Sequence, residues 1–145
     1  MPVNYWLMKS EPDTFGIDHL ARASRRTAPW DGVRNYQARN FLRDGFARGD
    51  RAFFYHSSCD EPGIYGTMEV VRAGYPEAAD PRWYQVDVRL LRKFAHPVTL
   101  AALREHAAGP LRDLIVLRRG NRLSIMPVTA DEWKFIHRLA RERAG

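Results

Sequence analysis

The segment from Trp83 to Phe94 restricts the fold more than any other part of the sequence. Its residues Tyr84, Val86, Val88 and Leu90 alternate with polar ones, which is the period of a strand with one buried face. This is the longest strand signal in the chain. The chain has 145 residues, of which 45% are hydrophobic, enough for one core but not for two full domains. We therefore expect a single domain, residues 1–145, that contains a sheet.

Four further segments have the character of strands, namely residues 5–9, 51–57, 64–71 and 122–127. The first is a short apolar run that stops before Pro12, because the residue before a proline is disfavoured in a helix. In the second, Phe53 and Tyr55 share one face while Phe54 and His56 share the other. Residues 24–29 between these strands have no such pattern, and we expect them to form a basic, polar loop.

Short helices are predicted at residues 17–23, 35–43, 99–107 and after Thr129. Asn35 can cap the second of these helices, and Thr129 with Glu132 forms a capping box at the start of the last one. Strands and helices do not alternate regularly, which favours an α+β fold over a parallel α/β fold. We expect a small, curved β-barrel of five or six mostly antiparallel strands with flanking short helices.

The charge of the chain favours a partner that carries phosphate. The formal net charge is +6, and arginine supplies 20 of the 23 basic residues. Residues 1–72 hold 10 basic and 9 acidic residues, whereas residues 73–145 hold 13 and 8, so the second half carries the excess. Such a surface attracts nucleic acid, and arginine suits bidentate phosphate contacts. The same composition also results from coding bias in a GC-rich genome.

No stretch is long and apolar enough to cross a membrane, and the first ten residues do not resemble a signal peptide. We therefore expect a cytoplasmic protein without membrane contact, and a monomer. Cys59 is the single cysteine, so it has no partner for an internal disulfide.

Sequence signatures of common enzymes are missing from the chain. It has no P-loop, GxGxxG, HExxH or GxSxG motif, and its five histidines lack the spacing of a zinc site. We therefore expect no cofactor, no metal and no enzymatic activity. One alternative stays open, a hydrolase-type enzyme acting on a modified nucleotide, in which Glu11, Asp31 and His56 converge on a cleft and His56 is the base.

Four segments place polar residues beside an aromatic residue or a glycine where a strand ends or begins: residues 9–12, 30–35, 55–57 and 119–124. This combination suits a flat heteroaromatic ligand, because an aromatic ring can stack on it while polar groups read its edge. The same residues have plain structural interpretations. Trp30 fits an ordinary core position, and Arg34 fits a salt bridge to Asp31 or Glu11.

These segments resemble the EVE domain family. The resemblance rests on residues 5–12, 30–40, 53–57, 62–66, 83–88 and 118–128, which follow the family order over nearly the whole chain. It implies a PUA-like β-barrel flanked by helices, related in shape to the YTH and ASCH domains, with a pocket for a modified base. Members of the family are connected with modified cytosines in DNA, and YTH domains with methylated adenine in RNA.

The resemblance also implies roles for individual residues. Trp30 would be the wall on which the base stacks, Val33 would contact its ring and Asn35 would bond its edge. The remaining residues of the implied pocket are Lys9, Ser10, His56, Ser57, Arg122, Leu123 and Ser124. Contacts to the nucleic-acid backbone would come from Arg34, Arg39, Arg119 and Arg122.

The leading hypothesis is therefore a domain that recognises a modified base in DNA or RNA. A second alternative, besides the enzyme, is a protein-interaction module with a vestigial pocket, whose basic half docks on an acidic partner. A nucleic-acid partner predicts that affinity falls as salt rises.

Overall fold

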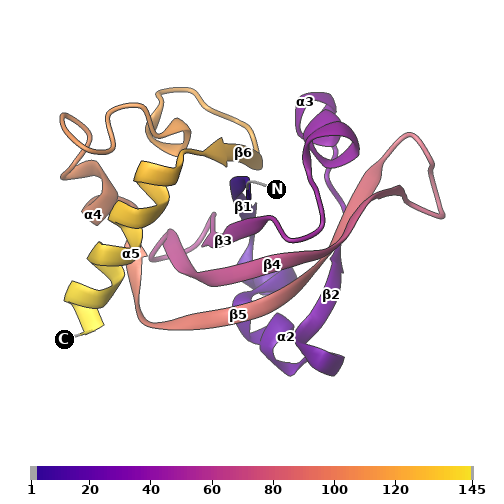
Figure 1. Ribbon diagram of the computed structural model, residues 1–145, viewed down its shortest axis with the longest axis horizontal. Coiled ribbons are helices and arrows are strands. Elements are labelled where there is room, and N and C mark those ends of the chain that lie inside the picture. Colours follow the sequence, from indigo (N-terminus) through magenta and orange to yellow (C-terminus); the bar gives the residue numbers. More distant parts are fainter. Residues whose placement is uncertain (1–2, 145) are drawn as a thin grey trace.

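Six strands form one mixed sheet in the computed structural model, which describes residues 3–144 (Figure 1). The order across the sheet is β2-β5-β4-β3-β1-β6. The strands are β1 (Tyr5–Ser10), β2 (Thr27–Trp30), β3 (Arg51–His56), β4 (Gly63–Pro76), β5 (Tyr84–Thr99) and β6 (Ile125–Val128). Only β1 and β3 are parallel, and the other four neighbouring pairs are antiparallel. The predicted α+β class, strand number and mostly antiparallel pairing are confirmed.

The sheet does not close into the predicted barrel, because β2 and β6 form its two edges and do not pair with each other. Both edge strands are four residues long and contain a proline, Pro29 and Pro127. Proline cannot donate a hydrogen bond to a neighbouring strand, so it suits an edge position. The prolines are a physical reason why the sheet stays open at these strands.

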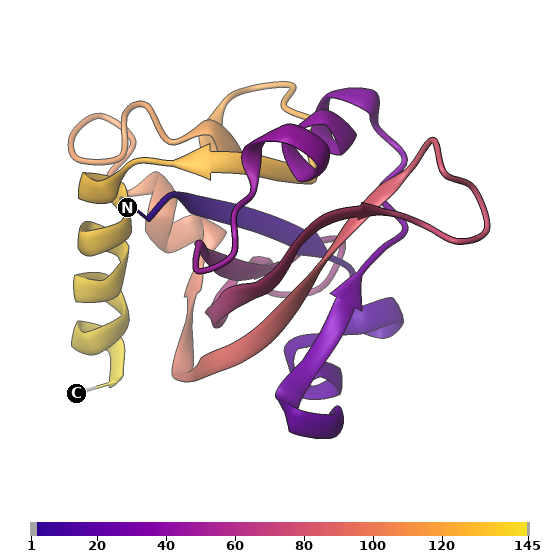
Figure 2. The same cartoon turned by 45° about the vertical axis from the view of Figure 1, so that its right-hand side comes forward.

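β4 and β5 are the longest strands and form a hairpin whose end projects beyond the rest of the sheet (Figure 2). Their pairing shifts register at four places, and such bulges bend and twist a sheet. The pairing with β2 continues along β5 from Val86 to Arg89. β2 corrects the prediction of a loop over residues 24–29, because residues 27–29 belong to this strand.

Short helices connect the strands: α1 (Pro12–Phe15), α2 (Ile17–Arg22), η1 (Ser24–Arg26), α3 (Tyr36–Asn40), the π-turn η2 (Phe41–Gly45), α4 (Leu100–Arg104) and η3 (Ile115–Leu117). The longer helix α5 (Ala130–Ala144) follows the last strand. The predicted caps are confirmed. The Asn35 side chain accepts a hydrogen bond from the Ala38 backbone N–H at 3.0 Å. Thr129 and Glu132 bond each other reciprocally at 2.9 and 3.1 Å. None of the described helices has the length and apolar character that crossing a membrane requires.

The core lies on both faces of the sheet, as the alternation of β3 predicts. Phe54 packs in a cluster with Trp6, Trp30 and α2, whereas Phe53 and Tyr55 pack in a second cluster with α4 and α5. The sheet is therefore covered on both faces, and the ends of β1 and β2 stay accessible.

Candidate ligand-binding pocket

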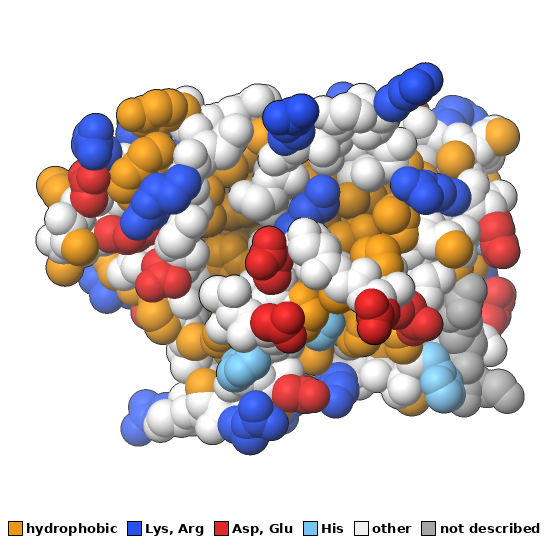
Figure 3. Space-filling view, turned by 180° about the vertical axis from the view of Figure 1, so that it is seen from behind, with side chains coloured by type: hydrophobic (Ala, Val, Ile, Leu, Met, Phe, Trp, Pro, Cys, Tyr) orange, Lys and Arg blue, Asp and Glu red, His pale blue; other side chains and the backbone are white. Residues whose placement is uncertain are grey.

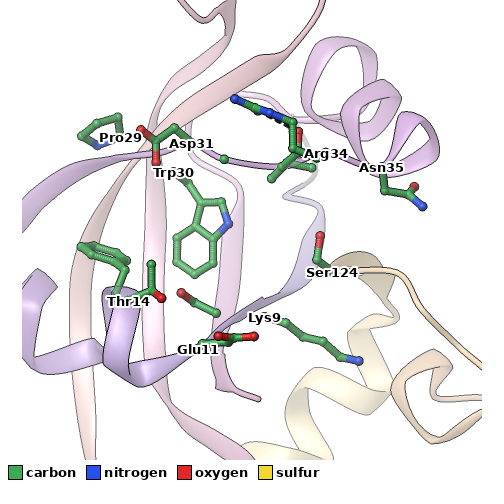
Figure 4. Close-up of a pocket in the computed structure, with 13 residues that line it drawn as sticks. Lys9, Glu11, Thr14, Pro29, Trp30, Asp31, Arg34, Asn35 and Ser124 are labelled. Carbon is green, nitrogen blue, oxygen red and sulfur yellow. Dashed lines mark hydrogen bonds between the residues drawn. The ribbon is translucent and has the colours of Figure 1, made fainter. Parts of the chain in front are cut away.

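A pocket of about 540 Å³ lies where β1 and β2 end, between α1 and the loop that leads to α3 (Figure 4). Its volume falls in the range of small-molecule sites. Its lining residues come from three separate parts of the chain: Lys9, Ser10, Glu11, Thr14, Phe15; then Pro29, Trp30, Asp31, Gly32, Val33, Arg34, Asn35; and Ser124. The topology brings these parts together, because the Lys9 backbone N–H donates to the Ser124 carbonyl at 2.8 Å.

Trp30 forms the centre of this pocket and also belongs to the core. Its ring packs edge-on against Phe54 and Phe15, with centroid distances of 5.0 and 5.9 Å. Only 4% of its surface is exposed, and Val33 beside it is also buried. Both interpretations of Trp30 thus hold in part. The indole is an apolar floor fixed by the core, and it presents only a small area on which a ligand can stack.

The rim of the pocket carries both hydrogen-bond donors and acceptors. Lys9 is half-buried, and this burial lowers the pKa of its ammonium group. Glu11 and Asp31 are exposed carboxylates on opposite sides of the Trp30 indole in Figure 4. The Asn35 Oδ1 atom is already bonded to α3, so its Nδ2 amide group is the part available as a donor. A ligand with hydrogen-bonding groups on several edges can therefore find a partner for each of them here.

Arg34 is bound to Glu77 directly after β4, and not to Asp31 or Glu11, the partners of the structural alternative. Its Nη1 and Nη2 atoms donate to the two carboxylate oxygens at 2.8 and 2.9 Å. The Gly32 backbone N–H donates to the same carboxylate at 3.2 Å, and Gly32 has φ +77°, which a glycine adopts readily. These contacts lower the pKa of Glu77 and raise the pKa of Arg34. Glu77 therefore anchors residues 31–35, the loop that leads to α3 and lines one side of the pocket.

Seven of the eleven residues predicted to bind the ligand line this pocket: Lys9, Ser10, Trp30, Val33, Arg34, Asn35 and Ser124. His56, Ser57, Arg122 and Leu123 lie outside it. Leu123 and Arg122 precede β6, and of this segment only Ser124 reaches the pocket. The Ser57 backbone N–H bonds the Ser10 carbonyl at 3.0 Å, so Ser57 extends the pairing of β3 with β1.

His56 is a structural residue in this fold. Its Nε2 atom accepts a hydrogen bond from the Ile17 backbone N–H at 3.0 Å, and its ring stacks on Tyr65 with a centroid distance of 4.0 Å. Burial lowers its pKa. Glu11 and Asp31 do line the pocket, but His56 does not join them. The cluster required by the enzyme alternative is therefore not assembled in the described structure.

Thr14, Phe15 and Pro29 line the pocket and were not predicted from the sequence. α1, which supplies Thr14 and Phe15, is four residues long with no buried residue, so no periodicity marks it. Pro29 belongs to the unpredicted strand β2. The sequence predicted only that the first strand stops before Pro12, which is the first residue of α1.

Of the four arginines predicted to contact a nucleic-acid backbone, Arg34 lines the pocket and the other three lie outside its lining. Arg119 and Arg122 are exposed in the loop before β6. Arg39 is partly exposed, and its Nη1 atom donates to the Arg82 carbonyl at 2.8 Å. Figure 3 shows one face of the molecule, on which Lys and Arg side chains lie along the upper side and Asp and Glu side chains lie across the middle. Lys and Arg side chains also lie along the lower edge, so on this face positive charge flanks the acidic band on both sides.

The fold and the pocket define a small α+β domain with a polar-rimmed pocket at the ends of β1 and β2. The family model of the EVE domain matches residues 4–139, and the chain belongs to this family. It is 39% identical to thymocyte nuclear protein 1 of Danio rerio, with 94% of this chain and 72% of that protein covered. The mouse protein of the same name is 40% identical, with 92% and 72% covered.

Solved structures have the same fold. The crystal structure of human THYN1 protein in complex with DNA containing 5-methylcytosine matches with a TM-score of 0.87 and 38% identity, covering 94% of this chain and 97% of that one. A hypothetical protein from Leishmania major matches with a TM-score of 0.89 and 37% identity, covering 99% and 98%. The Mmi1 YTH domain matches with a TM-score of 0.62 at 12% identity, covering 97% and 90%, which is a likeness of fold alone.

Proposed function

We propose that this domain binds nucleic acid and takes up one modified base in the pocket around Trp30. The observation that carries the proposal is the pocket itself, about 540 Å³ with an apolar floor and a rim of donors and acceptors. The complex of the human relative with 5-methylcytosine-containing DNA supports the choice of ligand, because that protein shares 38% of its residues with this chain. We propose a modified cytosine in DNA as the first candidate.

The chemistry of the rim fits the edge of a cytosine. Cytosine presents an exocyclic amine as a donor, and carboxylates such as Asp31 and Glu11 accept from this group. Its carbonyl oxygen needs a donor, which Lys9 or the Asn35 amide supplies. A methyl group on the ring would lie against the side chains of Val33 or Phe15, and this contact would remove the methyl group from water.

A base inside a duplex reaches this pocket only if it leaves the stack, which costs a few kcal/mol. Contacts between arginines and phosphates offset part of this cost. Arg119 and Arg122 are exposed and have no salt bridge among the residues described here, so they are available for such contacts. Affinity should therefore fall with rising salt, while the preference for the modified base should change less.

Fluorescence anisotropy with a panel of DNA and RNA oligonucleotides tests the proposal. The members of the panel differ in one base, cytosine or a modified form of it, or adenine and N6-methyladenine. We expect one modified base to bind most tightly, and Lys9→Gln to reduce this preference. Lys134→Gln is the matched control, because Lys134 is an exposed lysine that lines a different groove beside α5. Equal affinity for all members, unaffected by Lys9→Gln, would contradict the proposal.

A further inference from the structure

We propose that the nucleotide adjacent to the base in the pocket stacks on Tyr36, which together with Trp83 forms a second aromatic site outside the pocket. This inference rests on the proposed function, because it requires one base of the same strand to occupy the pocket. It adds a contact to the neighbouring nucleotide, and so predicts that the domain binds more than an isolated base.

Tyr36 is unusual because it is an aromatic side chain left in water. Among the described residues only Val3 and Tyr36 are large hydrophobic side chains in the exposed class, and 56% of the Tyr36 surface is exposed. Tyrosine is one of the residues enriched at binding interfaces, because its ring is apolar at one end and polar at the other. Its position is equally informative, since Arg34 and Asn35 directly before it line the pocket.

Trp83 holds the Tyr36 ring in place. The two rings are stacked, with centroids 4.9 Å apart and an angle of 26° between their planes. Trp83 itself is buried and fixed by the backbone at the end of the hairpin, where its N–H donates to Asp80 and its carbonyl accepts from Glu77. A ring that is already ordered loses little conformational entropy when a ligand binds. The pair is therefore preorganised to receive a flat partner.

The charges around the two rings favour a nucleotide over an uncharged aromatic ligand. The Arg39 guanidinium lies 5.1 Å from the centre of the Tyr36 ring, and the Arg34 guanidinium lies 5.2 Å from that of Trp83. Glu77 neutralises Arg34, whereas Arg39 has no carboxylate partner within residues 3–144. Arg39 thus offers positive charge next to an exposed ring. A nucleotide supplies the matching pair of groups, a base for the ring and a phosphate for the arginine.

The test uses single-stranded trinucleotides with the preferred modified base in the centre. An abasic sugar replaces the base on either side, which removes the stacking partner and keeps the phosphates. In the wild-type protein we expect the abasic replacement on one side to weaken binding by about tenfold, the size expected for one stacked base. In Tyr36→Ala and Tyr36→Leu the same replacement should change the affinity by less than about twofold, because the stacking surface is already missing. Phe135→Ala is the matched control, a partly exposed aromatic on α5 that should keep the full abasic effect.

Three outcomes would overturn the inference. The abasic replacement could cost the wild-type protein nothing on either side, or it could cost Tyr36→Ala and Tyr36→Leu as much as the wild type. Alternatively, both variants could weaken the modified mononucleotide as strongly as the trinucleotide, which would assign Tyr36 a purely structural role in holding α3. The proposed function fails on a different result, namely that the wild-type protein does not distinguish the modified base from its unmodified form.

Discussion

Replacing Glu77 by glutamine should destabilise the protein and weaken ligand binding together, because Glu77 anchors the pocket loop. Its carboxylate accepts two hydrogen bonds from Arg34 and one from Gly32, and its side chain is 10% exposed. A hydrogen bond to a charged group contributes about 1.5 to 3 kcal/mol when buried. The Arg34 side chain is 49% exposed, so water screens the pair, and glutamine keeps one acceptor oxygen. We therefore expect Glu77→Gln to lower the free energy of unfolding by about 1 to 2 kcal/mol.

Thermal unfolding measures this loss, which corresponds to a decrease in Tm of about 2 to 8 °C for a domain of this size. The matched control is Glu69→Gln, which removes a surface ion pair with Arg89 and should cost less than about 1 kcal/mol. The difference between wild type and Glu77→Gln should also depend on pH. Because the pKa of folded Glu77 is lowered, its contribution is present above its ordinary value of 4.5 and is lost as the pH falls through the folded pKa. A loss no larger than that of Glu69→Gln, or one that persists in acid, would refute this account of the loop.

Three further predictions concern the core and the buried polar groups. Trp30→Ala should lower the free energy of unfolding by about 3 to 5 kcal/mol in chemical denaturation, because the ring is buried, whereas Trp30→Phe should cost clearly less. Asp50→Ala should cost about 2 to 4 kcal/mol, since its buried carboxylate accepts from the Trp6 indole and two backbone N–H groups; an unchanged denaturation midpoint would contradict this. Burial lowers the pKa of both His56 and His137, so NMR titration should place both below 6.5, and their contribution to stability should be present above pH 6.5 and decline as the pH falls through the lowered values.

The stability of Trp30→Ala affects how the pocket must be tested. Because this substitution removes a core side chain, a loss of binding in it would have two explanations. Substitutions at the rim, such as Lys9→Gln, change the pocket without opening a cavity in the core. For this reason the rim residues are the better probes of ligand binding.

Much of the fold was predictable because its signals are local. The alternation of Val86 and Val88 marks β5, and the Asn35 cap and the Thr129–Glu132 capping box mark the starts of two helices. β2 was missed because it is short, contains Pro29 and is defined by its pairing with the distant β5. The sheet is open because of the order in which distant strands pair, and a local sequence pattern does not contain this order.

The pocket was predictable in part for a similar reason. Residues 30–35 form one contiguous segment, so identifying Trp30 also identified its neighbours. His56 was misplaced because it shares its strand face with Phe54, and on this face the start of α2 covers it. The structural alternative for Arg34 named Asp31 or Glu11 as its partner and missed Glu77. Glu77 is 43 residues away in the sequence, and sequence spacing does not reveal an ion pair at that separation.

The most direct test of the central claim follows the four tryptophan indole N–H signals by NMR during titration with an oligonucleotide that contains 5-methylcytosine. Each indole reports on a different place: Trp30 on the pocket, Trp83 on the Tyr36 site, Trp6 on the bond to Asp50, and Trp133 on the stack with Tyr5 and Phe53. A base in the pocket predicts that the Trp30 signal shifts most, while those of Trp6 and Trp133 stay in place. Shifts at Trp133 with an unchanged Trp30 signal would place the nucleic acid elsewhere and contradict the account.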